Sequence, residues 1–233
     1  MIPQDKITAS LDALYEKIDF EGREAIRNRR EMIDPVLNHL EQDKRLGLTL
    51  LIHIGGTVAG SLKAFMDEMR KLEPDQYFYP ESDLHVTVLD LISADQNFER
   101  NRLVIDESLE LAKSAISGLP PFCIDFNGII TSNAAVLAKG YYTGGLRNLR
   151  DRLRSIAMEQ GFDLRERYQS ISAHSTIIRY KSALQNREKF LTTLEKYKRF
   201  NIGGLKVNEL ELVIHDWYNR RREAIGKFYL GQV

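Results

Sequence analysis

The chain has 233 residues, 43% of them hydrophobic, and its 33 Lys and Arg side chains balance its 33 Asp and Glu side chains. This length and composition suit one large domain or two fused lobes with a substantial core. A neutral chain has no long-range field that attracts a polyanion, so we expect no binding of extended duplex nucleic acid. Cys123 is the only cysteine, which excludes an internal disulfide and a cysteine-based zinc site and predicts a buried thiol.

The N-terminal part of the chain predicts helices. Residues 6–18 and 21–45 read as two charged helices, the second restarting where Asp34 can cap and Pro35 can take the first helical position. Their apolar positions are enough to dock one face but too few for an independent core. Residues 1–46 are therefore expected to form a helical extension that packs on the rest of the chain or forms a homodimer contact.

The beginning of the chain also bears on location. Residues 1–6 contain no apolar signal core, and no stretch of the sequence approaches the length of a membrane-spanning helix. We expect a cytoplasmic protein that makes no membrane contact.

The next segments alternate between strand and helix patterns. Residues 48–54 form a continuous apolar run, typical of a strand buried on both faces, with His53 expected in the core. A Gly-Gly-Thr turn at residues 55–57 leads into a helix that ends near Leu72. Further helices are expected over residues 101–116, 146–160 and 186–197, and further strands over residues 122–130, 134–139, 207–217 and 223–230.

The helix expected over residues 146–160 is amphipathic. Its leucines keep helical spacing, and its arginines fall at other positions. This pattern predicts that the arginines lie on the surface; they are Arg147, Arg150, Arg152 and Arg154.

Two short strings share one plan: Asp-Leu-His85-Val-Thr87-Val-Leu and Ser-Ala-His174-Ser-Thr176-Ile-Ile. Each is a His-x-Thr that opens an apolar, β-branched run typical of a strand. Successive side chains of a strand point to opposite faces, so His and Thr lie side by side on one face. A single His on a strand is most often structural, but two of the five histidines in matching context favour a shared site.

The paired strings resemble the two signature motifs of the two-histidine (2H) phosphoesterase superfamily, which includes 2′,5′-RNA-ligase-like proteins and cyclic nucleotide phosphodiesterases. Residues 80–84, Pro-Glu-Ser-Asp-Leu, and the order of elements after them extend the similarity over about residues 48–230. The resemblance implies an α/β (α+β) fold that is two-lobed and pseudo-symmetric, with mostly antiparallel sheets flanked by helices. Residues 47–233 would form this two-lobed domain, after the extension of residues 1–46.

The chemistry follows from what a cyclic phosphodiester requires. One neutral and one protonated imidazole, from His85 and His174, can take a proton from water and deliver one to the leaving ribose oxygen. The Thr87 and Thr176 hydroxyls can donate hydrogen bonds to the phosphate oxygens. This chemistry requires neither a metal nor a cofactor, and the sequence does not distinguish the acid from the base.

Arg179 is a candidate for binding substrate phosphate. It stands five residues after His174, where several relatives of the resembled family also carry Arg. An odd separation places it on the face opposite His174 unless the strand twists or bulges.

The sequence therefore predicts a phosphoric diester hydrolase that opens a 2′,3′-cyclic phosphate, or a related 2′-linked phosphodiester, of a small nucleotide or RNA end. The same four residues could also serve a 2′,5′-RNA ligase or another RNA-end processing enzyme. A third interpretation is a non-catalytic module that binds nucleotides or RNA ends in the same cleft.

Overall fold

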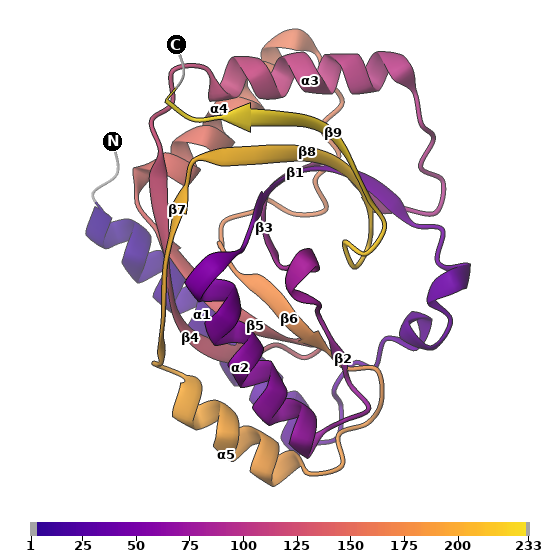
Figure 1. The fold of residues 1–233 in the computed structure, drawn as a ribbon, viewed down its shortest axis with the longest axis vertical. Coiled ribbons are helices and arrows are strands. Elements are labelled where there is room, and N and C mark those ends of the chain that lie inside the picture. The colour runs from indigo at the N-terminus through magenta and orange to yellow at the C-terminus, as the bar shows by residue number, and fades with distance from the viewer. Residues whose placement is uncertain (1–3, 232–233) are drawn as a thin grey trace.

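The computed structural model describes residues 4–231, so residues 1–3 of the expected extension lie outside the described part. The described chain forms two antiparallel sheets with five helices around them (Figure 1). The expected α/β fold with mostly antiparallel sheets is confirmed. The first sheet has the strand order β3-β1-β8-β9 and the second has the order β2-β6-β5-β4-β7.

The bounds of the elements are as follows. The first sheet contains β1 (Leu46–His53), β3 (His85–Asp95), β8 (Glu209–Asp216) and β9 (Arg222–Tyr229). The second sheet contains β2 (Tyr77–Phe78), β4 (Phe122–Thr131), β5 (Ala135–Tyr142), β6 (Ser175–Arg179) and β7 (Asn201–Val207). The helices are α1 (Gln4–Arg27), α2 (Gly56–Leu72), α3 (Arg102–Ile116), α4 (Gly144–Gln160) and α5 (Arg187–Tyr197).

The two sheets are not successive halves of the chain. The C-terminal hairpin of β8 and β9 pairs with β1 and completes the sheet that holds the first His-x-Thr. The short strand β2, from the first half, joins the second sheet by pairing with β6. Helices α3 and α4 contact each other, α3 also contacts β9, and α1, α2 and α5 contact strands of the second sheet (Figure 1). This exchange of strands places both His-x-Thr segments between the sheets.

The N-terminal region differs from the two predicted helices. One continuous helix, α1, spans most of it and ends where Arg29 adopts a φ of 55°, the left-handed conformation that commonly stops a helix. Asp34 does accept a hydrogen bond from the Val36 amide with Pro35 next to it, but this cap starts only a short 3₁₀ turn. Leu11 of α1 is fully buried, so the helix is part of the main core.

Two further predictions are wrong. Cys123 is exposed because β4 alternates, with Phe122 and Ile124 facing inward on either side of it. His53, the last residue of β1, is exposed between the buried Ile52 and Ile54, because successive side chains of a strand point to opposite faces. Within residues 4–231, no helix has the length and apolar character needed to cross a bilayer.

Candidate active site

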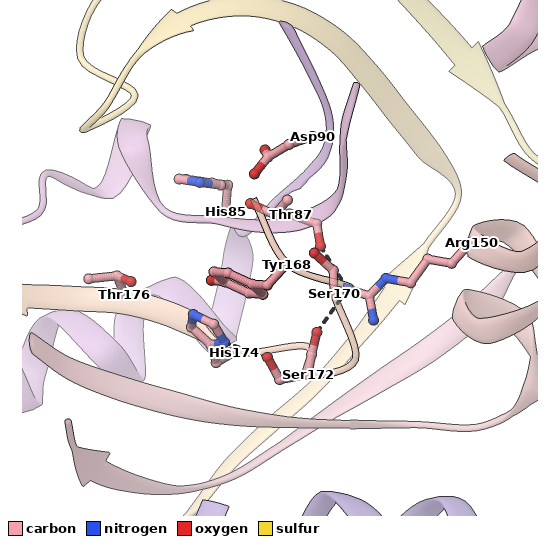
Figure 2. A pocket seen from close by; sticks show the side chains of 9 residues that line it. All are labelled: His85, Thr87, Asp90, Arg150, Tyr168, Ser170, Ser172, His174 and Thr176. Atoms are coloured by element: carbon pink, nitrogen blue, oxygen red, sulfur yellow. Dashed lines mark hydrogen bonds between the residues drawn. The ribbon is translucent and has the colours of Figure 1, made fainter. Parts of the chain in front are cut away.

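The four side chains of the two His-x-Thr strings line one cavity between the sheets. His85 and Thr87 lie on β3, His174 directly precedes β6 and Thr176 lies on that strand. Figure 2 shows both pairs around one space, with Tyr168 between them. An inner part of about 70 Å³ adjoins an outer part of about 350 Å³, and all four side chains line both. The fold thus brings together the residues that the sequence singled out, and their chemical roles stay predictions.

A β-bulge follows the Thr of each string. One residue after Thr87 in β3, and one after Thr176 in β6, has no partner in the neighbouring strand. An extra residue of this kind reverses the alternation of side chains. The third residue after each Thr therefore returns to the cleft, where Asp90 and Arg179 both line the cavity. The bulge explains how Arg179 joins His174 in spite of their odd separation.

These two additional side chains give the cleft opposite charges. Asp90 accepts a hydrogen bond from the Thr49 hydroxyl at 2.8 Å, and burial raises the pKa of its carboxyl. Arg179 donates from Nε to the Tyr79 hydroxyl at 2.9 Å. The carboxyl can accept from a ligand hydroxyl, and the remaining guanidinium N–H groups can donate to a phosphate.

The two histidines differ in the partner of Nδ1. His85 Nδ1 lies 2.8 Å from the backbone carbonyl oxygen of Asp83, which can only accept, so the neutral ring carries its proton there and leaves Nε2 free to accept. Asn219 Nδ2 donates to the same carbonyl at 3.1 Å. His174 Nδ1 lies 2.7 Å from the Ser172 hydroxyl, which can donate or accept, so this ring can hold its proton on either nitrogen.

Both rings are neutral at pH 7 in the free protein. Burial in the cleft is the largest cause and lowers the pKa of His85 and of His174 to about 4 each. The charged form of an imidazole loses hydration there, and the positive charge of Arg179 disfavours it further.

Arg150 is buried, and the prediction that it lies on the surface is wrong. Its side chain is among the largest fully buried ones, with 2% exposure. The guanidinium donates to the carbonyl oxygens of Thr87 and Val88 in the first motif segment, and of Ile171 and Ser172 before the second, at 2.8 Å each. Figure 2 shows it between the two segments. Helical spacing alone cannot reveal a cation whose partners are distant backbone carbonyls.

Arg154, on the same helix, is also mostly covered. It forms an ion pair with Glu166 at 2.8 Å and so ties α4 to the loop before the second motif. Arg147 and Arg152 keep partial contact with solvent.

Two residues near the histidines were not singled out from the sequence. His215 on β8 lies beside His85, with ring centroids 6.1 Å apart, because β8 and β3 flank β1 in the first sheet. Asn219 adopts a φ of 61°, a left-handed conformation that Asn tolerates well, and this conformation presents its amide to the Asp83 carbonyl. For Asn219, the sequence offers one signal, its place between the strands expected over residues 207–217 and 223–230.

Tyr15, on α1, supports the second motif from behind. Its hydroxyl donates to the Gly140 carbonyl at 2.9 Å and accepts from the Ala173 amide at 3.3 Å. Ala173 directly precedes His174, so the N-terminal helix helps to hold the segment that carries the second imidazole. Within residues 4–231, no group of three or more His, Cys, Asp or Glu side chains is arranged to hold a metal ion.

Comparisons with known proteins place the chain by family and by fold. Residues 58–219 match the family model described as the 2′-5′ RNA ligase superfamily. No curated protein matches the chain by sequence at a significant level. Similar solved structures include TT0787 of Thermus thermophilus, with 18% identity and a TM-score of 0.58, covering 80% of this chain and 97% of that one.

A second similar structure is Escherichia coli LigT complexed with 3′-AMP, with 18% identity and a TM-score of 0.55, covering 81% of this chain and 99% of that one. A conserved protein of unknown function from Agrobacterium tumefaciens has 14% identity and a TM-score of 0.53, covering 89% of this chain and 97% of that one. At these identities the structures establish a shared fold.

Proposed function

This chain belongs to the 2′-5′ RNA ligase superfamily, and from that premise we propose that it is a metal-independent phosphoesterase acting on a 2′,3′-cyclic phosphate, or a related 2′-linked phosphodiester, of a nucleotide or RNA end. The observation that carries the proposal is the meeting of two imidazoles and two threonine hydroxyls in one cavity. Arg179 adds a cation to the same cavity. Donors and proton carriers around one space suit the displacement of an oxygen at phosphorus.

The hydrogen bonds of the two histidines suggest which is the base. His85 presents an unprotonated Nε2 because its Nδ1 donates to the Asp83 carbonyl, so it would take the proton of the attacking water. With substrate bound, His174 would be protonated on both nitrogens, with Nδ1 donating to the Ser172 hydroxyl. It would then deliver the Nε2 proton to the leaving ribose oxygen and return to its neutral form. The bond from water oxygen to phosphorus forms as the bond from phosphorus to the ribose oxygen breaks.

The threonines and Arg179 would stabilise the phosphate during this exchange. Thr87 and Thr176 donate to its non-bridging oxygens, and the Arg179 guanidinium offsets the negative charge that these oxygens carry. An anion bound between the rings also favours the protonated form of an imidazole, which raises its pKa toward the range where it can act as an acid. A nucleotide ligand is further supported by the complex of the structurally similar LigT with 3′-AMP.

The test is turnover of 2′,3′-cyclic nucleotides and 2′,5′-linked oligonucleotides by the purified protein, with and without EDTA. We expect hydrolysis that EDTA leaves intact. Replacing His85 or His174 by Ala should lower turnover by roughly 10²–10⁴-fold, as expected for general acid–base groups. The matched control is His39→Ala, an exposed histidine outside the cavity, which should keep full activity.

Three outcomes would count against this proposal. Activity lost in EDTA and restored by a divalent ion would indicate a metal phosphoesterase. Tight binding of RNA ends without turnover would indicate the non-catalytic module. Joining of 2′,5′ ends in place of hydrolysis would indicate the ligase.

A further inference from the structure

A cluster of cations surrounds one indole at the outer part of the cleft. Trp217 follows β8 and lines the cavity of about 350 Å³. Three guanidinium carbons lie close to the centre of its ring: Arg167 at 4.0 Å, Arg45 at 5.0 Å and Arg179 at 5.6 Å. Arg167 and Arg179 also line the cavity, whereas Arg45 does not.

In the part of the chain that the structure describes, two of these three arginines form no ion pair. Arg45 forms an ion pair with Asp43 at 2.8 Å. Over residues 4–231, no carboxylate lies within ion-pair distance of Arg167 or Arg179, although both guanidinium groups approach the same ring. The two cations face one cavity, whose carboxylate, Asp90, forms an ion pair with neither of them, and an anion bound between them would offset their mutual repulsion.

The hydrogen-bond donors of the Arg167 side chain are available. Within residues 4–231 its guanidinium lies over the indole and forms no hydrogen bond, so its N–H groups can bind a phosphate in bidentate fashion. The backbone amide of Arg167 donates to the Ser93 hydroxyl at 3.0 Å, which fixes this loop position against β3. Because Arg167 occupies the indole face, Trp217 supports the cation, and the ligand that fits is an anion.

We propose, on the basis of the function proposed above, that Arg167 supported by Trp217 forms a subsite for a second phosphate of the substrate. The reacting phosphate would lie between the histidines and next to Arg179, with the second phosphate toward Arg167. The preferred substrate is then a cyclic phosphate that carries another phosphate group. That group is either the 5′-phosphate of the same nucleotide or the preceding phosphodiester of an RNA strand.

The experiment compares kcat/KM for three substrates: adenosine 2′,3′-cyclic phosphate, the same nucleotide with a 5′-phosphate, and the dinucleotide ApA ending in a 2′,3′-cyclic phosphate. A second phosphate should raise kcat/KM by roughly 10–100-fold, the effect expected of charge-assisted hydrogen bonds. Arg167→Gln should lower this ratio toward one. Preference for the 5′-phosphorylated nucleotide would identify the mononucleotide source, and preference for the dinucleotide would identify an RNA strand.

The matched control is Arg165→Gln, an exposed arginine two residues earlier that pairs with Asp163 and does not line the cavity; it should keep the ratio of the unmodified protein. Equal kcat/KM for all three substrates, or a ratio that Arg167→Gln leaves unchanged, would overturn the subsite.

A binding measurement tests the subsite for the second phosphate independently of the proposed reaction. Calorimetry with adenosine 3′-phosphate and adenosine 3′,5′-bisphosphate should show tighter binding of the bisphosphate by roughly tenfold or more, lost in Arg167→Gln. If the protein turns over none of the substrates but shows this difference, the proposed reaction fails and the subsite stands. Equal affinities for the two nucleotides would overturn the subsite whatever the activity.

Discussion

The histidines of the cleft allow a prediction at the scale of single residues. In the free protein, NMR titration should give pKa values of about 4 for His85 and His174, well below the ordinary value of 6.5, because burial penalises the charged rings. Adenosine 3′-phosphate should raise at least one of them, since its anion lies beside the imidazoles. Adenosine without phosphate is the control and should leave both unchanged. Values near 6.5 in the free protein would contradict the buried, neutral pair.

The same two histidines predict how the free energy of unfolding changes with pH. Unfolded histidines take up protons near pH 6.5, whereas His85 and His174 in the folded protein resist protonation until about pH 4. The unfolded state therefore binds more protons in this window, so the free energy of unfolding should fall as the pH drops from about 6.5 to about 4. Denaturant titrations at several pH values across that range measure the free energy of unfolding directly.

Site residues that are close together in the sequence could be predicted from it. Site residues that meet only through tertiary structure could not. His85 and Thr87 share a face because strand geometry fixes a spacing of two, and this holds wherever the strand lies. His215 reaches His85 only because β8 pairs with β1, a contact between segments that are far apart in the sequence. Arg179 reaches the cleft only because of the bulge in β6. The alternation of side chains read from the sequence does not reveal such a bulge.

Arg150 supports a prediction at the scale of elements, because it connects α4 to both motif segments. Replacing it by Met keeps a long side chain but removes the guanidinium from four carbonyl oxygens, of which only that of Ile171 keeps a second side-chain donor, the Tyr142 hydroxyl. We expect the free energy of unfolding to fall by about 3 kcal/mol, the scale of a lost buried network. Activity of the folded variant should fall by roughly 10–100-fold, because small misplacement of catalytic groups is costly.

The control for Arg150→Met is Arg147→Met on the same helix, where the side chain is 42% exposed and pairs with Asp151 on the surface. This variant should change the free energy of unfolding by less than about 0.5 kcal/mol. Full activity in a stably folded Arg150→Met protein would show that the motif segments keep their positions without the guanidinium.

Helices and strands could be predicted where the segment has a clear apolar periodicity. They could not be predicted where that periodicity is interrupted. The helices α2, α3 and α5 and the strands β4 and β8 follow their apolar periodicity closely. The strand β7 was not predicted because Gly203 and Gly204 interrupt its β-branched pattern, and pairing with β4 compensates for them. Residues 30–45 continue a helical composition, but α1 ends at Arg27, next to the left-handed conformation of Arg29.

At the scale of the whole molecule, the N-terminal helix is joined to the second sheet and to the site. Tyr15 and Ile26 are buried in the common core, and Ile18 lines the cleft. Asp19 accepts a hydrogen bond from the Thr131 amide at the end of β4 and pairs with Arg23. Because α1 contributes both to the core and to these polar contacts, it is expected to support stability as well as the position of His174.

Removal of this helix should therefore destabilise the protein. A protein that lacks residues 1–30 should melt at a lower temperature, because the apolar face of β4 and β5 loses its cover and the Ala173 amide loses the Tyr15 hydroxyl. Tyr15→Phe removes only that hydroxyl and should cost about 1–2 kcal/mol of unfolding free energy, with reduced turnover at unchanged mass. Sedimentation of both variants checks for a homodimer contact through the exposed side of α1. A shortened protein that keeps its melting temperature and mass but loses affinity for RNA ends would show that α1 is a recognition element and not a structural one.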